Sequence, residues 1–184
     1  MIRATAVLLL STAASACTVS VNSGNRTPPA RALTAELRDA QGTAIGTATL
    51  TQEQGFVRLV AEVRGLTPGQ HGIHVHARGT CTPPDFASAG GHFNPAAHQH
   101  GMGNPAGPHA GDFPNLEAGA DGRARYDAVS QHLTLVGAGA VMADSAAVVI
   151  HAQRDDQVTD PSGNSGPRIA CGILTAATGR RTAP

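Results

Sequence analysis

The sequence predicts an all-β domain, a Greek-key barrel or sandwich, and two observations carry this prediction. The chain has 22 Gly and 12 Pro among its 184 residues and is only 3% aromatic. That composition favours short strands joined by many turns over long helices. Short segments in which apolar and polar residues alternate also recur along the chain, with Gly-containing turns between them. Short antiparallel strands with evenly spaced turns are typical of a Greek-key barrel or sandwich.

The N-terminus has the features of an export signal. Arg3 supplies a positive charge, residues 6–10 are apolar, and small residues lead up to Cys17. The apolar stretch is too short to span a bilayer, which is typical of a cleaved secretory signal. Small residues followed by Cys are similar to the lipobox of bacterial lipoproteins, so we expect a lipoprotein-type signal peptide over 1–16 and a lipid on Cys17. Ala14 stands where that motif more usually has Leu, and the alternative is an ordinary signal that leaves Cys17 as a free thiol.

The rest of the chain divides by composition into a tether, one domain and a tail. Residues 17–30 are polar and are predicted to form a flexible tether, residues 31–177 the domain, and residues 178–184 a C-terminal tail. In chain order, the predicted strands cover 32–37, 44–50, 56–63, 72–77, 123–129, 146–152 and 169–174. Two irregular stretches cover 79–117 and 153–168. The first is so long that something must order it, as bound metal would.

Charge and cysteine content narrow the classes of function. The formal net charge is zero, every basic residue is Arg, and no basic run occurs, so a nucleic-acid partner is not expected. Three Cys in an exported chain leave one unpaired. If Cys17 carries a lipid, Cys81 and Cys171 remain, either as a disulfide in an oxidising compartment or as two separate buried thiols.

The chain has nine His, and two of them form His74-x-His76 on a predicted strand. Alternate side chains of a strand face opposite sides, so both imidazoles face one way while Ile73 and Val75 face the core. The two imidazoles can therefore bind one metal together. By itself this spacing is a weak signal, because two unrelated polar residues also produce it.

The first irregular stretch adds a second group of metal-ligand residues. It contains His92, His100, His109 and Asp112, which suit a four-coordinate zinc site with no open position. His151 lies on a predicted apolar strand, where a lone His is usually a core residue. Beside the other imidazoles it supplies the fourth nitrogen that completes a His-rich copper site.

These residues stand in motifs that resemble the copper-zinc superoxide dismutase family from about residue 33 to residue 174. The motifs are Gly72-Ile73-His74-Val75-His76, Gly90-Gly91-His92-Phe93-Asn94-Pro95, His100-Gly101, His109-Ala110-Gly111-Asp112, Ile150-His151-Ala152, Gly163-Asn164-Ser165-Gly166 and Arg168-Ile169-Ala170-Cys171-Gly172. Together, in this order and spacing, they are highly specific. The resemblance implies an eight-stranded Greek-key β-barrel or sandwich in which two long loops form the metal site.

The resemblance also implies the ligands, residue by residue. One copper per subunit would be bound by His74, His76, His92 and His151. One zinc per subunit would be bound by His92, His100, His109 and Asp112. His92 would then bridge the two metals as an imidazolate, because two nearby dications favour the deprotonated ring.

Three further residues match supporting positions of the family. Asp155 matches the carboxylate that links a zinc His to a copper His and so fixes the orientation of both rings. Its neighbour Asp156 is interpreted as a solvated loop acid. Cys81 and Cys171 match the family's intrasubunit disulfide, which would hold the irregular ligand loop to the last strand.

Three His are not assigned as ligands. His98 is two residues from His100 and is the alternative zinc ligand, but the family spacing favours His100, so His98 is expected in solvent. His71 matches a structural His near the copper strand. His132 has no predicted role.

The reaction implied by the resemblance is disproportionation of superoxide to oxygen and hydrogen peroxide, with His92 and Arg168 as catalytic residues. His92 would take up a proton and pass it on. Arg168 stands at the position of the family's anion-guiding Arg, where a fixed guanidinium attracts and orients a small anion. Residues 156–168 lack the acid-and-Lys cluster that some members use for steering, so steering is expected to rest on Arg168, together with Arg154.

Two other functions compete with this interpretation. An exported copper or zinc buffer would keep the fold without turnover, but all four predicted copper ligands and Arg168 are present. A zinc hydrolase needs an open zinc position, whereas the predicted zinc ligands fill all four. The expected partners are superoxide and a membrane, reached through the lipid anchor. The expected location is periplasmic or cell-surface, and a homodimer is left open.

Overall fold

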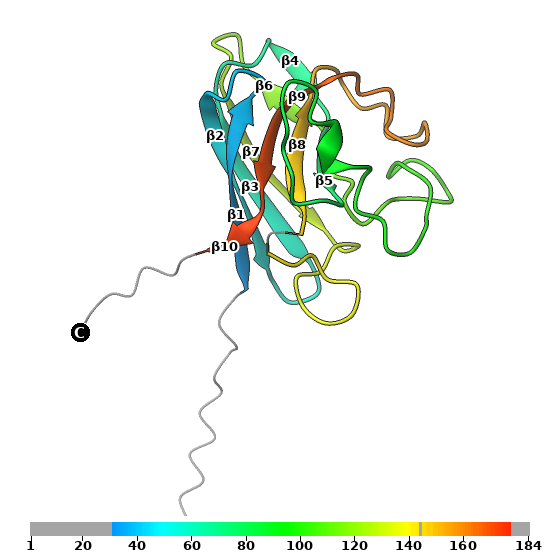
Figure 1. Cartoon of the computed structure of the whole chain (residues 1–184). Helices are drawn as coiled ribbons and strands as arrows, with labels where there is room; N and C mark the ends of the chain where they lie inside the picture. The colour runs from blue at the N-terminus through cyan, green and yellow to red at the C-terminus, as the bar shows by residue number, and fades with distance from the viewer. Residues whose placement is uncertain (1–30, 144, 178–184) are drawn as a thin grey trace, which may run out of the picture.

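A computed structural model of the chain describes residues 31–143 and 145–177, and the regular secondary structure in these ranges is almost entirely β-strand (Figure 1). The described ranges contain ten strands and one short 3-10 helix: β1 (Ala32–Asp39), β2 (Ala44–Gln52), β3 (Val57–Val63), β4 (Gly69–His71), β5 (Ile73–His76), η1 (Ala87–Ala89), β6 (Leu116–Ala118), β7 (Ala124–Ser130), β8 (Ala147–His151), β9 (Arg168–Ile173) and β10 (Thr175–Ala176). The predicted signal, the tether with Cys17 and the tail lie outside the described residues. Within the described part of the chain, no helix has the length and hydropathy needed to cross a membrane.

Eight of the described strands form one curled antiparallel sheet, which confirms the all-β prediction. Its order is β5-β8-β9-β1-β2-β3-β7, with β10 paired to β1. Strands far apart in sequence are neighbours, as in β3 with β7 and β1 with β9, which is the connectivity of a Greek key. Each of the seven predicted segments contains a strand, although the ends differ by one or two residues.

The pair β4 and β6 forms a separate two-stranded sheet that was not predicted. β6 begins within the stretch 79–117 and ends just beyond it, so the end of that stretch is a strand rather than irregular backbone. β10 was also not predicted. Strands of two or three residues are too short to show an alternating pattern.

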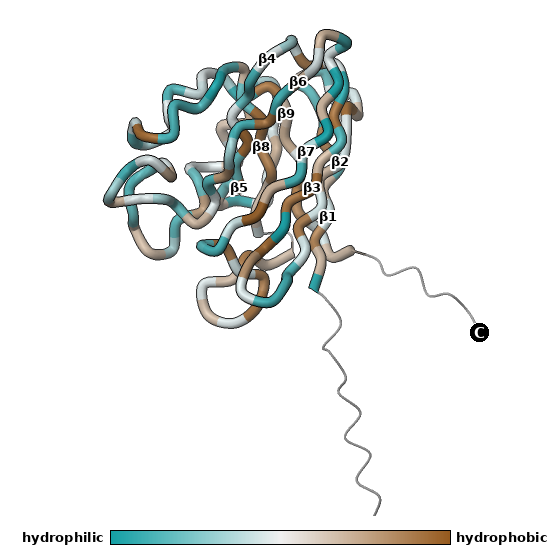
Figure 2. Tube along the Cα trace, turned by 180° about the vertical axis from the view of Figure 1, so that it is seen from behind, coloured by the Kyte–Doolittle hydropathy of each residue, from teal (hydrophilic) through white to brown (hydrophobic). Residues whose placement is uncertain are grey.

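The core lies inside the curl of the sheet. On β3 the inward-facing residues are buried and apolar: Val57, Leu59, Ala61 and Val63. The residues between them face solvent, as the two-residue period of a strand requires. Figure 2 shows hydrophobic colour concentrated along the strands, whereas the loops that project from one side are mostly hydrophilic.

β5 and β8 differ from the other strands because every residue in both is buried. Ile73 and Val75 face the core, and the two His of β5 face the opposite way. The long loops that follow β5 and β8, green and orange in Figure 1, lie beside these two strands. The second face of β5 and β8 is therefore buried beneath the loops that carry the predicted ligands.

Candidate metal centre

The loop that follows β5 folds back and hydrogen-bonds to that strand. Val75 N donates to Gly111 O over 2.9 Å, Phe93 N donates to Val75 O over 2.8 Å, and Gly111 N donates to Phe93 O over 2.8 Å. A Cβ at Gly111 would lie only 2.2 Å from Val75 O. The absence of a side chain at this position is what allows the loop to lie so close to β5.

These backbone contacts gather four imidazoles, which we call the four-histidine set: His74, His76, His92 and His151. Each offers one ring nitrogen, and these nitrogens all lie within 4.8 Å of one another. The rings of His74 and His92 are stacked with centroids 3.9 Å apart. Nε2 of His151 is 3.5 Å from Nε2 of His76. Two neighbouring strands and one loop thus converge on a common point.

In three of these rings, the outer nitrogen, which is the one that points away from the centre of the set, makes a hydrogen bond. His76 Nδ1 donates to a backbone carbonyl over 2.9 Å, and His151 Nδ1 donates to another over 3.0 Å. His74 Nε2 donates to Asp155 Oδ2 over 2.7 Å. The opposite nitrogens face the centre of the set. Among them, His74 Nδ1 and His92 Nε2 are buried and have no hydrogen-bond partner in the described part of the chain.

Burial keeps the rings of the four-histidine set neutral. Burial, together with the nearby His92, lowers the pKa of His74 to about 3 and that of His151 to about 4. Burial also holds the pKa of His76 well below its usual value and lowers that of His92. Neutral imidazole is the form that binds metal, so the fold presents these side chains ready for coordination.

A second group, the Asp112 set, shares one residue with the first: His92, His100, His109 and Asp112. His92 Nδ1 donates to Asp112 Oδ1 over 2.8 Å, and His109 Nδ1 is 3.4 Å from the same oxygen. His100 Nδ1 lies 3.1 Å from Asp112 Oδ2 without making a hydrogen bond to it. All four side chains are buried, and three Nδ1 atoms surround one carboxylate.

Two carboxylates control the protonation of His100 in the Asp112 set. Burial lowers the pKa of His100, but the nearby Asp112 carboxylate and the hydrogen bond to Asp155 outweigh this and raise the pKa to about 9. Burial raises the pKa of Asp112, but the adjacent His100 ring and the hydrogen bond from His92 hold it well below the usual range.

Asp155 joins the two sets. Its Oδ2 accepts from His74 and its Oδ1 accepts from His100 Nε2 over 3.1 Å, and its side chain is fully buried. The amide of Asn115 holds the backbone of Asp155 in place. Asn115 Nδ2 donates to Asp155 O and Asn115 Oδ1 accepts from Asp155 N, each over 2.8 Å. Sequence reasoning missed Asn115, because no spacing relates it to a residue 40 positions later.

The predicted disulfide is present between Cys81 and Cys171, with Cα atoms 5.7 Å apart. It attaches the segment that contains η1 to β9, on which Arg168 also lies. Two carbonyl groups of that segment hold the guanidinium. Arg168 Nη1 donates to Phe86 O and Nη2 donates to Gly90 O, both over 2.7 Å. Gly90 O also accepts the bond from His76, so one carbonyl connects Arg168 to the four-histidine set.

The half-buried guanidinium opens onto a cavity of about 450 Å³. Its lining includes three of the four-histidine set and Arg168: His76, His92, His151 and Arg168. Arg154 does not line this cavity, because its Nε donates to Gln70 Oε1 over 2.9 Å. Arg154 therefore does not share the cavity wall with Arg168, and its contribution to steering stays a prediction.

The remaining His lie outside both sets. His71 is buried, with Nδ1 2.8 Å from His151 O. His98 is exposed, with Nδ1 3.1 Å from Pro108 O, and His132 is exposed. None of the three joins a group of metal-ligand atoms within the described residues.

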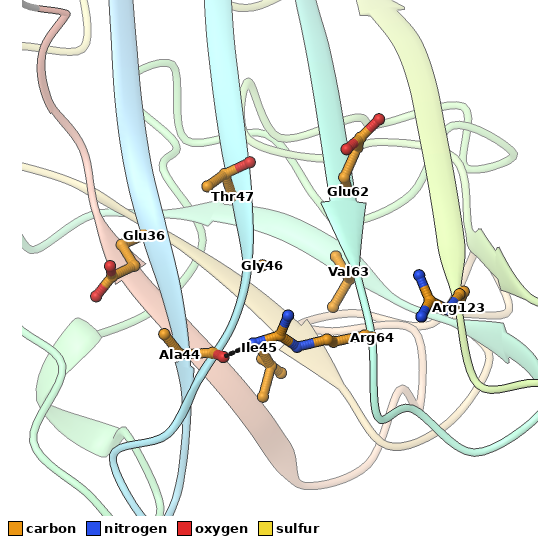
Figure 3. Close-up of a pocket in the computed structure, with 9 residues that line it drawn as sticks. All are labelled: Glu36, Ala44, Ile45, Gly46, Thr47, Glu62, Val63, Arg64 and Arg123. Carbon is orange, nitrogen blue, oxygen red and sulfur yellow. Dashed lines mark hydrogen bonds between the residues drawn. The ribbon is translucent and has the colours of Figure 1, made fainter.

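A second cavity, of about 350 Å³, lies where β2 begins and the antiparallel β3 ends (Figure 3). Its charged lining residues are Glu36, Glu62, Arg64 and Arg123. Arg64 reaches across its floor and donates from Nη2 to Ala44 O over 3.0 Å. The lining contains no His or Cys, and its acidic and basic groups balance. It has no features of a metal site.

The comparisons with known proteins point to one family. The model of the family "Copper/zinc superoxide dismutase (SODC)" matches residues 44–174. A superoxide dismutase [Cu-Zn] from Caulobacter vibrioides is 42% identical over 146 residues, which cover 77% of this chain and 84% of the relative. Superoxide dismutase [Cu-Zn] 2 from Aquifex aeolicus is 41% identical over 144 residues, which cover 76% of this chain and 84% of that protein. The crystal structure of a superoxide dismutase-like protein from Bacillus subtilis is also similar, with a TM-score of 0.71 and 40% identity over 77% of this chain and 97% of that one.

Proposed function

The chain belongs to the copper/zinc superoxide dismutase family, and from this premise we propose how its own residues perform the family's reaction. It is a superoxide dismutase, which converts superoxide to oxygen and hydrogen peroxide with copper and zinc as cofactors. The residue assignment rests on one observation above all: the four-histidine set and the Asp112 set share a single imidazole, His92.

The side chains of both sets fit these metals. The four-histidine set offers only imidazole nitrogens, which suit copper. The Asp112 set offers three imidazoles and one carboxylate, which suit a closed, tetrahedral zinc site. Buried polar atoms are normally hydrogen-bonded, so the unpartnered His74 Nδ1 and His92 Nε2 support a metal between them.

We assign copper to His74, His76, His92 and His151. We assign zinc to His92, His100, His109 and Asp112. When bound, copper supplies a one-electron redox couple, whereas zinc supplies fixed positive charge without redox chemistry. Asp155 orients one imidazole of each set, since its two oxygens accept from His74 and His100.

Arg168 is proposed to bind and orient the superoxide anion. Two carbonyl groups fix its guanidinium, and the cavity it lines is also lined by His76, His92 and His151. A half-buried guanidinium is screened less by water than an exposed one, so it attracts a small anion more strongly. The disulfide helps to hold this geometry, because it attaches the segment that carries both carbonyls to β9.

His92 is proposed to hold and transfer a proton. Its Nδ1 is turned toward Asp112, and its Nε2 is the nitrogen on the side of the four-histidine set. Burial lowers the pKa of this ring, which favours release of a proton once it has been taken up. The atom that we expect to pass a proton to the reduced substrate is therefore His92 Nε2.

We propose export for this protein, with a lipid on Cys17 as the membrane anchor. The relatives include an extracellular superoxide dismutase [Cu-Zn] from Brugia pahangi, and this supports export. The lipid is proposed from the residues that precede Cys17 alone, and mass spectrometry of the mature N-terminus would test it. A homodimer remains a prediction that analytical ultracentrifugation of the mature chain would test.

A metal titration followed by an activity assay tests the assignment. The metal-free mature chain is titrated anaerobically with Zn²⁺ and then Cu²⁺, and bound metal is measured by elemental analysis. We expect one equivalent of each metal and consumption of superoxide. Binding of both metals without turnover would instead indicate a metal buffer.

The shared imidazole is tested by paired substitutions. His92→Ala is expected to weaken the binding of both metals, because His92 belongs to both sets. His98→Ala removes an exposed imidazole that belongs to neither set, and it should leave both affinities unchanged. If His92→Ala weakened only one metal, the two sites would not share this ligand.

A further inference from the structure

Two imidazoles belong to the Asp112 set alone, and the outer nitrogen of each faces a different carboxylate. His100 Nε2 donates to Asp155 Oδ1 over 3.1 Å. His109 Nε2 lies 3.7 Å from Asp160 Oδ1. The outer nitrogen of a metal-ligating imidazole generally donates to a carboxylate, a carbonyl or water, and that contact fixes the ring and raises its basicity. Asp160 therefore faces His109 as Asp155 faces His100, although 3.7 Å is an ion-pair distance and not that of a hydrogen bond.

Asp160 makes a second contact with the same set. Its Oδ1 also accepts a hydrogen bond from His100 N over 2.6 Å. One carboxylate oxygen thus contacts the backbone of one ligand and the ring of another. The side chain of His109 is only 7% exposed, whereas that of Asp160 is 49% exposed, so the carboxylate covers the solvent side of an almost buried ring.

The loop that carries Asp160 also borders the cavity beside the four-histidine set. Pro161 and Ser162 follow Asp160 directly, and both line that cavity together with Arg168. The segment that contacts the Asp112 set is thus continuous with one wall of the substrate cavity.

The loop that carries Asp160 also has internal hydrogen bonds that do not involve the Asp160 side chain. Asp156 accepts hydrogen bonds from Val158 N over 2.9 Å, from Thr159 N over 2.8 Å and from Asn164 Nδ2 over 2.9 Å. Thr159 Oγ1 also donates to Asp156 Oδ2 over 2.7 Å. A change confined to the Asp160 carboxylate should therefore leave the loop folded.

We propose that Asp160 is a positioning residue of the zinc site. Its carboxylate orients the ring of His109 through Nε2 and holds His100 through its backbone N–H, and both contacts strengthen zinc binding. This inference rests on the proposed function, because it requires that the Asp112 set binds zinc.

The test is Asp160→Asn in the full mature chain. The amide oxygen of Asn can still accept from His100 N, but the negative charge that faces His109 is lost. We expect zinc affinity to fall by about 10- to 100-fold, the usual effect of removing such a partner. Competition with a chromophoric chelator measures that affinity. Co²⁺ placed in the same site provides a second probe, because its visible absorption spectrum should shift when the ring of His109 changes orientation.

Asp156→Asn is the matched control. It alters an acid in the same loop that contacts no ligand of the Asp112 set, so it loosens the loop without removing the proposed contact. We expect its zinc affinity to fall much less than that of Asp160→Asn, because the Asp160 carboxylate itself stays in place. Thermal unfolding of the metal-free variants should show a larger loss for Asp156→Asn than for Asp160→Asn.

The possible outcomes separate the two claims. If Asp160→Asn bound Zn²⁺ as tightly as the unaltered chain, or if Asp156→Asn weakened zinc equally, the role of Asp160 would be overturned. If the unaltered chain failed to bind Zn²⁺, the proposed function would fall and this inference with it.

Discussion

Gly111→Ala tests how closely the loop that carries Asp112 must lie on β5. The new Cβ would be 2.2 Å from Val75 O and 3.1 Å from Phe93 N, whereas real Cβ atoms essentially never approach closer than 3.0 Å. The contacts are to backbone atoms, which cannot rotate away as a flexible side chain can. The loop must therefore move off the strand by about 0.8 Å at this point.

The expected cost follows from what that movement disturbs. Gly111 lies between two backbone hydrogen bonds, one accepted from Val75 N and one donated to Phe93 O. Each contributes about 0.5–1.5 kcal/mol net, and overpacking adds about 1–3 kcal/mol. We expect the free energy of unfolding of the metal-free protein to fall by about 2–5 kcal/mol. Because Asp112 follows directly, bound zinc should also fall.

Chemical denaturation and elemental analysis measure these two effects. Gly91→Ala is the matched control, since a Cβ there would have no heavy atom within 4 Å and its φ is compatible with Ala. This control should unfold at nearly the same denaturant concentration as the unaltered chain and keep its zinc. If Gly111→Ala matched Gly91→Ala in both measurements, the close approach would not be a requirement of the site.

Three further predictions concern the anion, the disulfide and pH. Arg168→Ala should slow superoxide capture by about tenfold or more and reduce the salt dependence of the rate, while metal content stays constant. Pulse radiolysis at two ionic strengths measures both effects. An unchanged rate and salt dependence would contradict the role of Arg168. Replacing Cys81 and Cys171 together by Ser opens a loop of 90 residues. The chain-entropy model then predicts that the free energy of unfolding falls by about 4.6 kcal/mol. A loss of under about 1 kcal/mol in urea denaturation would refute that estimate. The metal-free protein should lose stability as pH falls from about 6.5 toward 4, because His74 and His151, with pKa values of about 3 and 4, stay neutral when folded but bind protons when unfolded. Each contributes a slope of up to about 1.4 kcal/mol per pH unit, and a flat profile over that range in denaturation experiments would contradict the burial argument.

Local sequence patterns were sufficient wherever a property repeats along the backbone. The alternation in residues 56–63 predicted a strand with one buried face, and β3 has that face. The same period predicted that His74 and His76 share one side of β5 while Ile73 and Val75 enter the core, as they do. The density of His in the stretch 79–117 also indicated a ligand-bearing loop, although β6 at its end was missed.

Contacts between residues far apart in the sequence could not be predicted from a local repeat. Arg154 was expected to steer the substrate together with Arg168; it lies outside the cavity lining and bonds to Gln70 on β4, a strand too short to predict. Asn115 and Asp160 contact Asp155 and the zinc ligands across 40 to 60 residues, and neither stands in a recognisable spacing. Their roles depend on how two irregular loops pack against each other.

The sequence by itself determined the seven longest strands, the buried side of β3 and of β5, and the residue types available to bind metal, because these depend on a two-residue period and on the chemistry of single side chains. The tertiary structure alone decided which imidazole nitrogen points to the centre, which carboxylate holds each ring, and where the loop must lie against β5. Those features are set by the pairing of strands and loops far apart in the chain, and no local pattern encodes the distance between them.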